Sequence, residues 1–469
     1  MKPVGKGGKI GRLLIANRGE IAVRILHSCQ RLGIETVLAV SEADQDSLPA
    51  RLADRCVCIG PPPPSESYLN ISALVMAALA TGCDGIHPGY GFLSESASFA
   101  EACVQNGLTF VGPPADVLRL VGDKVAAKQI ARAAAVPTIP SSPPVADWQE
   151  ASAAAGKIGY PVMVKAVGGG GGRGIFLAND AAKIRELFAA ASQGAREWFG
   201  ADGGLYVERC LPRARHIEVQ VAADRFGRVA HLGERECSVQ RRFQKVIEET
   251  PAPRLPRLMR TALHKAAVEF ARECRFATVG TVEFLVDGDC QEFFFLEMNP
   301  RIQVEHPVTE AVTGIDLVSE QIKLATGAPL TFEQAQVEFV GHAIECRITA
   351  ESPLDDFAPS PGRITAWRPP GTTGIRVDSH CYPGYLISPY YDSLIAKVIS
   401  HGRNRTEAIS RMASALKEFV VEGIETTLGF QRYLIGHADF ASAVFHTNWL
   451  EDVAGADYRR GRESPVGAY

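Results

Sequence analysis

The first quarter of the chain repeats one pattern, in which a short apolar run precedes a segment whose apolar residues recur at helical spacing. The runs predict strands at residues 13–16, 36–40, 56–59, 85–86 and 108–111. The segments predict helices at residues 19–32, 71–80 and 97–105. Repeated units of this kind indicate a parallel sheet with helices on both faces, and ligands of such sheets bind at the carboxyl ends of the strands.

Farther along, strict alternation of apolar and polar residues replaces the helical pattern. In residues 216–222, three apolar residues alternate with Glu218 and Gln220, which predicts a half-buried strand. Its expected sheet partners are residues 229–232, 282–286 and 292–296, and an amphipathic helix is expected at 255–272. From residue 342 the chain is β-rich, with Pro-Gly turns and one helix at 406–419. The pattern therefore predicts a second sheet and then a third, β-rich region.

Five consecutive glycines, residues 168–172, follow an apolar run that ends at Lys165 and precede Arg173 and Gly174. Glycine lets the backbone approach a ligand closely, and a row of amide N–H groups suits the oxygens of a triphosphate. A flexible linker is the alternative for a glycine run taken alone. The segment is not a P-loop, because no Gly-Lys pair in the chain is followed by Ser or Thr. The surrounding strand, lysine and arginine favour phosphate binding.

Composition narrows the class of protein. The length of 469 residues suggests about three domains, and the net charge of −4 argues against nucleic-acid binding through bulk charge. Eleven cysteines are scattered without a Cys-x-x-Cys pair, which favours reduced thiols over a zinc site or a redox dithiol. No apolar run approaches the ~20 residues that span a bilayer. We therefore expect a cytoplasmic enzyme that binds neither nucleic acid nor a membrane.

Residues 297–306 (Glu-Met-Asn-Pro-Arg-Ile-Gln-Val-Glu-His) form the densest group of polar side chains. On an extended strand Glu297, Asn299 and Arg301 would point to the same face. Two oxygen ligands followed by a guanidinium suit Mg²⁺ beside an anionic substrate, and Glu283 on a neighbouring predicted strand could complete the set. A solvated charged strand face is the alternative.

A second cluster, residues 234–245, carries Arg235, Arg241, Arg242 and Lys245 around a predicted turn. Such a cluster is typical of a solvated face or an RNA-like patch, and it would equally suit an anion pocket. Taken alone, Glu305 is typical of a surface carboxylate and Arg347 of an ion-pair partner.

Taken together, these segments resemble the biotin carboxylase component of biotin-dependent carboxylases, within the ATP-grasp superfamily, over roughly residues 11–450. The resemblance is specific because long segments match in family order: residues 15–22, 87–95, 122–124, 165–174, 215–220, 237–245, 297–310, 345–347, 359–362 and 390–393.

The resemblance implies a multidomain α/β and α+β fold. It predicts a Rossmann-like N-terminal domain at residues 1–122 and an ATP-grasp domain at 123–336, with a mobile lid at about 140–208. It further predicts a β-rich C-terminal domain at 337–450 and a tail at 451–469.

The resemblance also implies residue roles for ATP, bicarbonate and the biotin of a carrier protein. The implied phosphate ligands are Lys124, Lys165 and the backbone of Gly170, Gly171 and Gly172. The implied adenine and ribose contacts are Glu208, Arg209, Leu211, His216 and Gln240. The implied ligands of Mg²⁺ or Mn²⁺ are Glu283, Glu297 and Asn299. The implied bicarbonate contacts are Lys245, Arg301, Gln303 and Val304, with Glu305 as the general base. The implied biotin contacts are Tyr90, Arg347, Gln303 and Val304.

The chain departs from the family pattern at one site position, since Phe243 stands where the family has histidine. At positions of bacterial dimer contacts, His27, Arg31 and Thr373 also differ, so a homodimer is left open. No Ala-Met-Lys-Met tetrapeptide is present, and we expect the biotin carboxyl carrier protein and the carboxyltransferase subunits to be separate chains.

The expected role is that of the biotin carboxylase subunit of an acyl-CoA carboxylase, such as the acetyl-CoA carboxylase of fatty acid biosynthesis. The alternatives are another ATP-grasp ligase that acts through an acyl phosphate, such as a carbamoyl-phosphate or amide-forming enzyme, and a nucleotide-binding regulator without turnover.

Overall fold

The computed structural model describes residues 9–166, 175–199, 204–289 and 291–463. Its N-terminal unit is a parallel sheet with the strand order β3-β2-β1-β4-β5. The strands are β1 (Arg12–Ile15), β2 (Glu35–Val40), β3 (Arg55–Cys58), β4 (Gly85–His87) and β5 (Thr109–Phe110). The helices are α1 (Gly19–Leu32), α2 (Leu48–Leu52), α3 (Ile71–Ala80) and α4 (Ala97–Gln105).

Side chains of β1 alternate between two cores, because successive residues of a strand point to opposite faces. Leu13 and Ile15 pack with α1, whereas Leu14 and Ala16 pack with α3 and α4. Helices α3 and α4 begin where Asn70 and Ser96 accept the backbone N–H groups of Ala73 and Phe99. The predicted parallel sheet with helices on both faces is confirmed.

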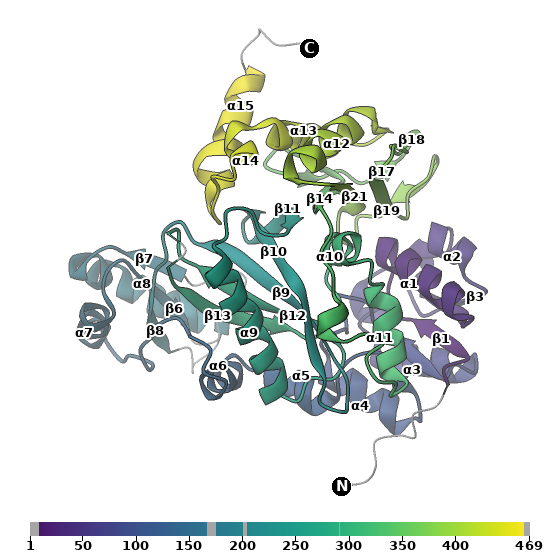
Figure 1. Ribbon diagram of the computed structural model, residues 1–469, viewed down its shortest axis with the longest axis horizontal. Coiled ribbons are helices and arrows are strands. Elements are labelled where there is room, and N and C mark those ends of the chain that lie inside the picture. Colours follow the sequence, from purple (N-terminus) through teal and green to yellow (C-terminus); the bar gives the residue numbers. More distant parts are fainter. Residues whose placement is uncertain (1–8, 167–174, 200–203, 290, 464–469) are drawn as a thin grey trace.

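An eight-stranded antiparallel sheet with the order β13-β12-β9-β10-β11-β14-β21-β19 forms the centre of the molecule (Figure 1). Its strands are β9 (Arg215–Ala223), β10 (Val229–Arg241), β11 (Gln244–Thr250), β12 (Val279–Val286), β13 (Phe293–Asn299), β14 (His342–Thr349), β19 (Ile375–Ser379) and β21 (Leu394–Gly402). Since β14, β19 and β21 lie beyond residue 337, the sheet runs across the predicted domain boundary at 336–337.

Two sets of helices cover different halves of this sheet. One apolar core joins β9, β12 and β13 to α5 (Ala115–Gly122), α6 (Lys124–Ala133) and α9 (Arg257–Glu273). Another joins β11, β14 and β21 to α12 (Arg405–Glu418) and α13 (Leu428–Gly436). Helices α10 (His306–Thr313) and α11 (Leu317–Ala325) connect the halves. The polar face of the second half is therefore turned toward the N-terminal unit and the site described below.

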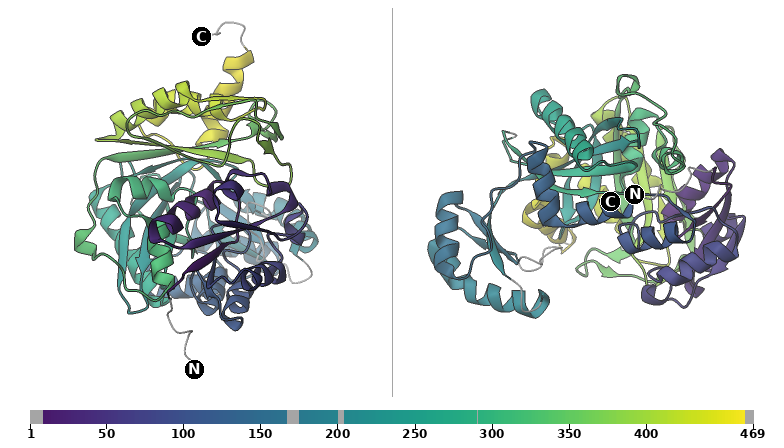
Figure 2. Two further views of the ribbon diagram at one scale, coloured as in Figure 1. Left: turned by 90° about the vertical axis from the view of Figure 1, so that its right-hand side faces the viewer. Right: turned by 90° about the horizontal axis from the view of Figure 1, so that it is seen from below.

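A small unit projects from the central sheet on the side away from the N-terminal unit (Figure 2, right). It consists of a three-stranded antiparallel sheet covered by two helices, with an apolar core of its own. Its elements are α7 (Trp148–Ile158), β6 (Val162–Ala166), β7 (Ile175–Ala178), α8 (Ala181–Phe199) and β8 (Leu205–Arg209). We call this unit the lid, because it corresponds to the lid predicted at about residues 140–208.

The remaining elements complete the C-terminal part. They are β15 (Glu351–Ser352), β16 (Ala358–Pro359), β17 (Gly362–Arg363), β18 (Ala366–Arg368), β20 (Leu386–Ile387), β22 (Val420–Glu422), α14 (Ala438–Ala441) and α15 (Gly455–Glu463). The segment expected to be a tail thus contains a helix, and its Tyr458 packs against Phe430 with ring centroids 5.0 Å apart. Among the described residues, none of the helices has both the length and the apolar character that crossing a membrane requires.

Two expectations need correction. The strand at 216–222 was predicted to be half-buried, but all nine residues of β9 are buried, because its polar face lies against other polar side chains rather than water. The strand predicted at 229–232 extends to Arg241 and forms a hairpin with β11, so the basic segment 234–245 is mostly strand. Alternation shows which residues share a face, but not what covers that face.

Candidate active site

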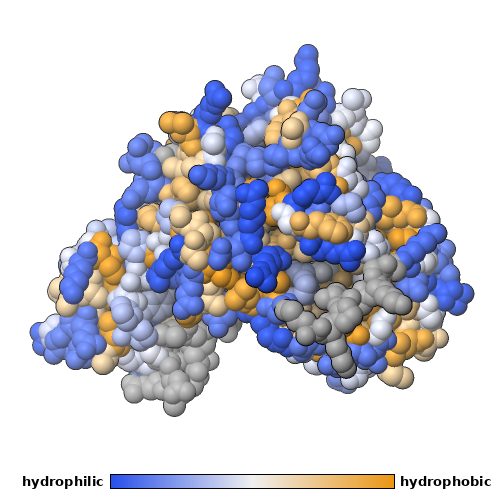
Figure 3. All heavy atoms as spheres, turned by 60° about the horizontal axis from the view of Figure 1, so that its bottom comes forward, coloured by the Kyte–Doolittle hydropathy of each residue, from blue (hydrophilic) through white to orange (hydrophobic). Residues whose placement is uncertain are grey.

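A cavity of about 1180 Å³ is lined by the N-terminal unit, the lid, the central sheet and the C-terminal part. The surface is indented between the lid and the N-terminal unit (Figure 3). The predicted site residues that the structure describes all lie at this cavity or directly beside it. Gly170, Gly171 and Gly172 lie outside the described residues.

Glu305 lies at the inner end of the cavity between two cations. The Nζ of Lys245 is 2.6 Å from Oε1 of Glu305, and Nη2 of Arg347 is 2.9 Å from Oε2. Only 1% of the surface of Glu305 is exposed, which excludes the interpretation of this residue as a surface carboxylate. Burial opposes its ionisation, but Lys245, Arg347 and Arg235 outweigh burial and lower the pKa of Glu305 below its ordinary value. We call this group of ionised side chains around Glu305 the base end of the cavity.

Two further carboxylates hold the cations of the base end in place. Glu248 pairs with Arg347, and the Nζ of Lys245 lies 2.6 Å from Glu218. Burial raises the pKa of Glu248 to about 7, although Arg347 opposes the shift. Sequence reasoning assigned neither carboxylate a role, because Glu218 was only a polar position of the alternating strand at 216–222 and Glu248 lay outside the motifs.

Arg235 of β10 lies against the polar side chains of β9, and it is completely buried. Its guanidinium donates to Glu218, Gln220 and Gln303, and also to Thr281 and Thr309. The four cations of the basic cluster therefore lie in different surroundings. Arg235 is in the interior and Lys245 is in the cavity. Arg241 and Arg242 pair with exposed Asp356 near the cavity mouth. The anion-pocket interpretation fits the first two, and the solvated-face interpretation fits the last two.

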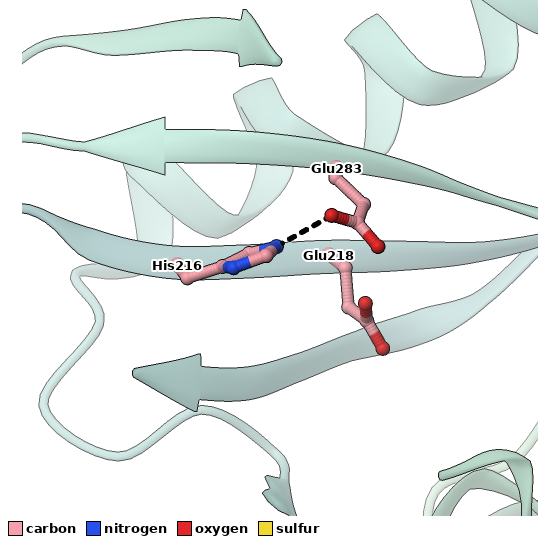
Figure 4. Close-up of side chains that lie close together, drawn as sticks. All are labelled: His216, Glu218 and Glu283. Carbon is pink, nitrogen blue, oxygen red and sulfur yellow. Dashed lines mark ion pairs between the residues drawn. The ribbon is translucent and has the colours of Figure 1, made fainter. Parts of the chain in front are cut away.

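Glu283 occupies the middle of the cavity wall and contacts several groups at once. Its Oε1 accepts hydrogen bonds of 2.7 Å from both Asn299 and Gln303, and it lies 3.1 Å from Nζ of Lys245. Its Oε2 lies 2.8 Å from Nε2 of His216. Figure 4 shows His216 and Glu283 directed toward each other, with Glu218 beside them.

These residues fit a divalent cation. The ligand atoms of His216, Glu218 and Glu283 lie within 4.8 Å of one another, and Glu297 and Asn299 line the same cavity. Carboxylate and amide oxygens are the donors that Mg²⁺ and Mn²⁺ prefer. An ion bound at Glu283 would supply positive charge to this carboxylate, which Lys245 partly neutralises without it.

The opposite end of the cavity, which we call the nucleotide end, lies between the lid and the central sheet. Buried Glu208 at the end of β8 pairs with Lys165 of β6 and, at 3.0 Å, with Lys128 of α6. Lys124, Arg209 and Leu211 also line the cavity. On the central sheet, Nε2 of Gln240 lies 3.4 Å from Nδ1 of His216. The strands and helices that meet here belong to separate apolar cores.

Phe243 lies at the tip of the β10–β11 hairpin, with 66% of its surface exposed. It lines the cavity, and both it and Arg242 have positive φ, 66° and 47°, as the tight turn requires. No hydrogen bond can come from this side chain, which is an exposed phenyl ring.

Tyr90 and Arg301 reach the cavity from loops that follow strands. Asn17 donates hydrogen bonds of 2.7 Å to the carbonyls of Pro88 and Tyr90 and so holds the loop after β4. Between them Gly89 has φ 64°, and a Cβ there would lie 2.8 Å from the amide of Asn17. Arg301 follows the end of β13 and pairs with Glu95, while its Nη2 donates to Oδ1 of Asn299 at 3.1 Å.

Three family models match the chain in succession. They are the biotin carboxylase N-terminal domain at residues 9–118, the ATP-binding domain of the carbamoyl-phosphate synthase L chain at 123–333, and the biotin carboxylase C-terminal domain at 345–452.

Individual relatives agree. The chain is similar to biotin carboxylase 1 of Bacillus subtilis, with 51% identity over 95% of this chain and 100% of the relative. It is also similar to a solved biotin carboxylase–ATP complex from Campylobacter jejuni, with a TM-score of 0.89, 44% identity, and coverage of 94% of this chain and 99% of the other.

A third similar structure is the biotin carboxylase domain dimer of the 2-oxoglutarate carboxylase of Hydrogenobacter thermophilus, solved with MgADP, ADP and bicarbonate. Its TM-score is 0.88 and its identity 42%, with coverage of 95% of this chain and 98% of the other.

Proposed function

Because the chain belongs to the biotin carboxylase family, we propose that it uses ATP and bicarbonate to carboxylate biotin on a separate carrier protein. The observation that carries the proposal is the base end of the cavity, where Glu305 lies between Lys245 and Arg347. A buried carboxylate flanked by two cations can bind a small anion and also accept its proton.

Glu305 acts as the base in the first step. Bicarbonate is an anion, so its arrival draws Lys245 and Arg301 toward its oxygens and away from their carboxylate partners. With less cationic stabilisation, the pKa of Glu305 rises and the carboxylate can take the proton of bicarbonate. The deprotonated oxygen attacks the γ-phosphate of ATP, which forms carboxyphosphate and releases ADP.

Lys124 and Lys165 neutralise the phosphate oxygens during this transfer, together with the backbone at Gly170, Gly171 and Gly172. The ribose and adenine contacts are Glu208, Arg209, Leu211, His216 and Gln240. Glu283, Glu297 and Asn299 would hold Mg²⁺ or Mn²⁺, which would supply charge neutralisation for the phosphate transfer.

The second step takes place beside Arg347. Carboxyphosphate breaks down to CO₂ and phosphate, and the phosphate removes the proton from N1′ of biotin. Arg347 then stabilises the enolate-like oxygen of the ureido ring, while Tyr90, Gln303 and Val304 orient the ring. The closed lid excludes water from the carboxyphosphate.

The partners follow from the same proposal. A biotin carboxyl carrier protein brings biotin to the cavity, and carboxyltransferase subunits choose the final acceptor, for which we propose an acyl-CoA such as acetyl-CoA. The solved dimer of a related domain supports a homodimer. The free thiols of the described cysteines support a cytoplasmic location. The domain limits of the sequence prediction, 1–122, 123–336 and 337–450, are retained in the proposal, and the three family matches support them.

The test measures ADP release with ATP and bicarbonate, with and without free biotin. We expect stimulation by biotin, and a loss on the order of 10²–10³ in the stimulated rate of Arg347→Ala, because an oxyanion partner is removed. Arg368→Ala, at an exposed position, is the matched control and should keep the rate. Turnover with amine acceptors but no biotin stimulation would instead identify another ATP-grasp ligase, and tight ATP binding without hydrolysis would identify a regulator.

A further inference from the structure

A buried lysine that has no part in the proposed reaction lies directly behind the base end. Lys397 belongs to β21 and is completely buried. Its Nζ donates a hydrogen bond of 2.8 Å to the backbone carbonyl of Val304 and lies 3.1 Å from Oε1 of Glu20. A buried ammonium is costly unless it is paired and hydrogen-bonded, so a particular arrangement must compensate for it.

Glu20 connects this lysine to the cavity wall. It lies in the first turn of α1 and is 3% exposed, and its Oε1 also accepts the hydroxyl hydrogen of Tyr90. One carboxylate oxygen therefore joins Lys397 to Tyr90. Through these two side chains, the central sheet is tied to helix α1 and to the loops that carry Tyr90 and Val304.

The strand register explains why Lys397 stands at this place. Arg347 of β14 and Asp378 of β19 are the direct cross-strand partners of Lys397, so the three side chains form one row on the polar face of the sheet. Oδ2 of Asp378 is 3.9 Å from Nζ of Lys397. Arg347 faces the cavity at one end of the row, and Lys397 lies next to it without reaching the cavity itself.

A third carboxylate near the ammonium differs from the other two. Glu345 is completely buried, and neither of its oxygens has a hydrogen-bond partner among the described residues. Burial raises the pKa of Glu345 far above its ordinary value, although Lys397 opposes the shift. Burial therefore favours the neutral form of Glu345, and Glu20 and Asp378 are the carboxylates that lie 3.1 and 3.9 Å from Nζ of Lys397.

We propose that Lys397 and Glu20 are positioning residues for biotin, which fix the carbonyl of Val304 and the hydroxyl of Tyr90 in the orientation that binds the ureido ring. The inference rests on the proposed function, which assigns Val304 and Tyr90 to biotin. Among the described residues assigned to ATP, none forms a hydrogen bond or an ion pair with Lys397 or Glu20. Loss of the pair should therefore weaken biotin binding and leave ATP binding unchanged.

Three variants test the pair: Lys397→Met, the nearly isosteric Glu20→Gln, and the double variant. Lys397→Met alone leaves a buried carboxylate without its cation and can prevent folding, whereas the double variant removes both charges together. Lys417→Met, at an exposed position of α12, is the matched control. For each protein, ADP release is measured against free biotin and against ATP, and the melting temperature is recorded.

We expect the KM for biotin to rise about 10- to 100-fold in Glu20→Gln and in the double variant, as for the loss of hydrogen bonds to charged groups. The KM for ATP should stay within about twofold of the unmodified protein, as should both values in Lys417→Met. This split between the two substrates is the result that a purely structural role would not produce.

The inference is overturned if Glu20→Gln and the double variant fold and keep the original KM for biotin. It is equally overturned if all three variants fail to fold, or if the KM values for biotin and ATP rise together, since the pair would then only hold the fold together. An unmodified protein without any biotin stimulation would instead contradict the proposed function, so the two failures are distinguishable.

Discussion

The two ends of the cavity are built in different ways. At the base end, Lys245, Glu305 and Arg347 form a continuous set of ion pairs on one sheet and the loop beside it; Glu305 is buried, and the two cations are half-buried. At the nucleotide end, Glu208 and Lys165 come from the lid and Lys128 from α6. Donors that belong to one rigid sheet are already oriented before substrate binds, whereas groups on separate units have to be brought together.

Substitutions at the two ends of the cavity should therefore have different effects on the reaction. Changes at the base end should reduce the rate of the chemical step, because that end is fixed before binding. Changes at the nucleotide end should mainly alter the affinity for ATP, because binding energy must hold the units together there.

The largest effect is expected at the base end, in Glu305→Gln. The amide keeps the shape of the side chain but cannot accept the proton of bicarbonate, so bicarbonate-dependent ADP release should fall about 10²- to 10⁴-fold. ATP binding, measured by calorimetry, should remain. Exposed Glu338→Gln serves as the control. A rate within a few fold of the original would contradict the role of Glu305 as base.

A smaller effect is expected at the nucleotide end, in Lys165→Ala. Loss of a charged hydrogen bond to phosphate should raise the KM for ATP about 10- to 100-fold with a smaller change in kcat. Steady-state kinetics at saturating bicarbonate measure both constants. If kcat fell as far as in Glu305→Gln while the KM for ATP stayed constant, the two ends would not differ in the way described.

The pH dependence of stability provides a third comparison through His306, which follows the base and is completely buried. Burial, together with Lys397, lowers the pKa of His306 well below its ordinary value of 6.5. Below pH 6.5 the unfolded chain then binds a proton that the folded protein does not, so stability is lost as the pH falls, by up to about 1.4 kcal/mol per pH unit. His306→Gln should flatten the dependence of urea denaturation on pH between 6.5 and 5. An equally steep dependence in the variant would assign it to other groups.

The smallest effect is expected at the mouth of the nucleotide end, in Phe243→His. An imidazole at this exposed turn can donate the hydrogen bond that the phenyl ring lacks, so the KM for ATP should fall about two- to tenfold. Phe226→His, on an exposed turn away from the cavity, is the matched control. A higher KM would mean that the ring itself packs against the nucleotide.

Local pattern predicted much of the fold. Helices α1, α3 and α4 have the bounds that the periodicity predicts, and the parallel N-terminal sheet follows from repeated strand–helix units. The pattern did not predict that β14, β19 and β21 continue the central sheet, because pairing between strands far apart in sequence leaves no periodic signal. It also misjudged β9, whose polar face is covered by Arg235 and its partners.

The residues of the candidate site also differ in whether the sequence predicted them. Glu305, Arg347 and Lys245 were predicted through ordered motifs, and the glycine segment through its composition. Lys397 lay outside every motif, Glu20 lay in the matching segment 15–22 without an assigned role, and Arg235 was only one member of the basic cluster. Each is an ordinary charged residue in the sequence, and it becomes distinctive only by being buried against particular partners.

By itself, the sequence determined the order of strands and helices, the family and the chemical types gathered for the reaction, since these depend on neighbouring residues. Only the tertiary structure decided which charged side chains lie next to one another. Lys245 and Glu305 are 60 positions apart, and Lys397 and Val304 are 93 apart. The energy of an ion pair depends on distance in space and on exclusion of water, and neither can be read along the chain.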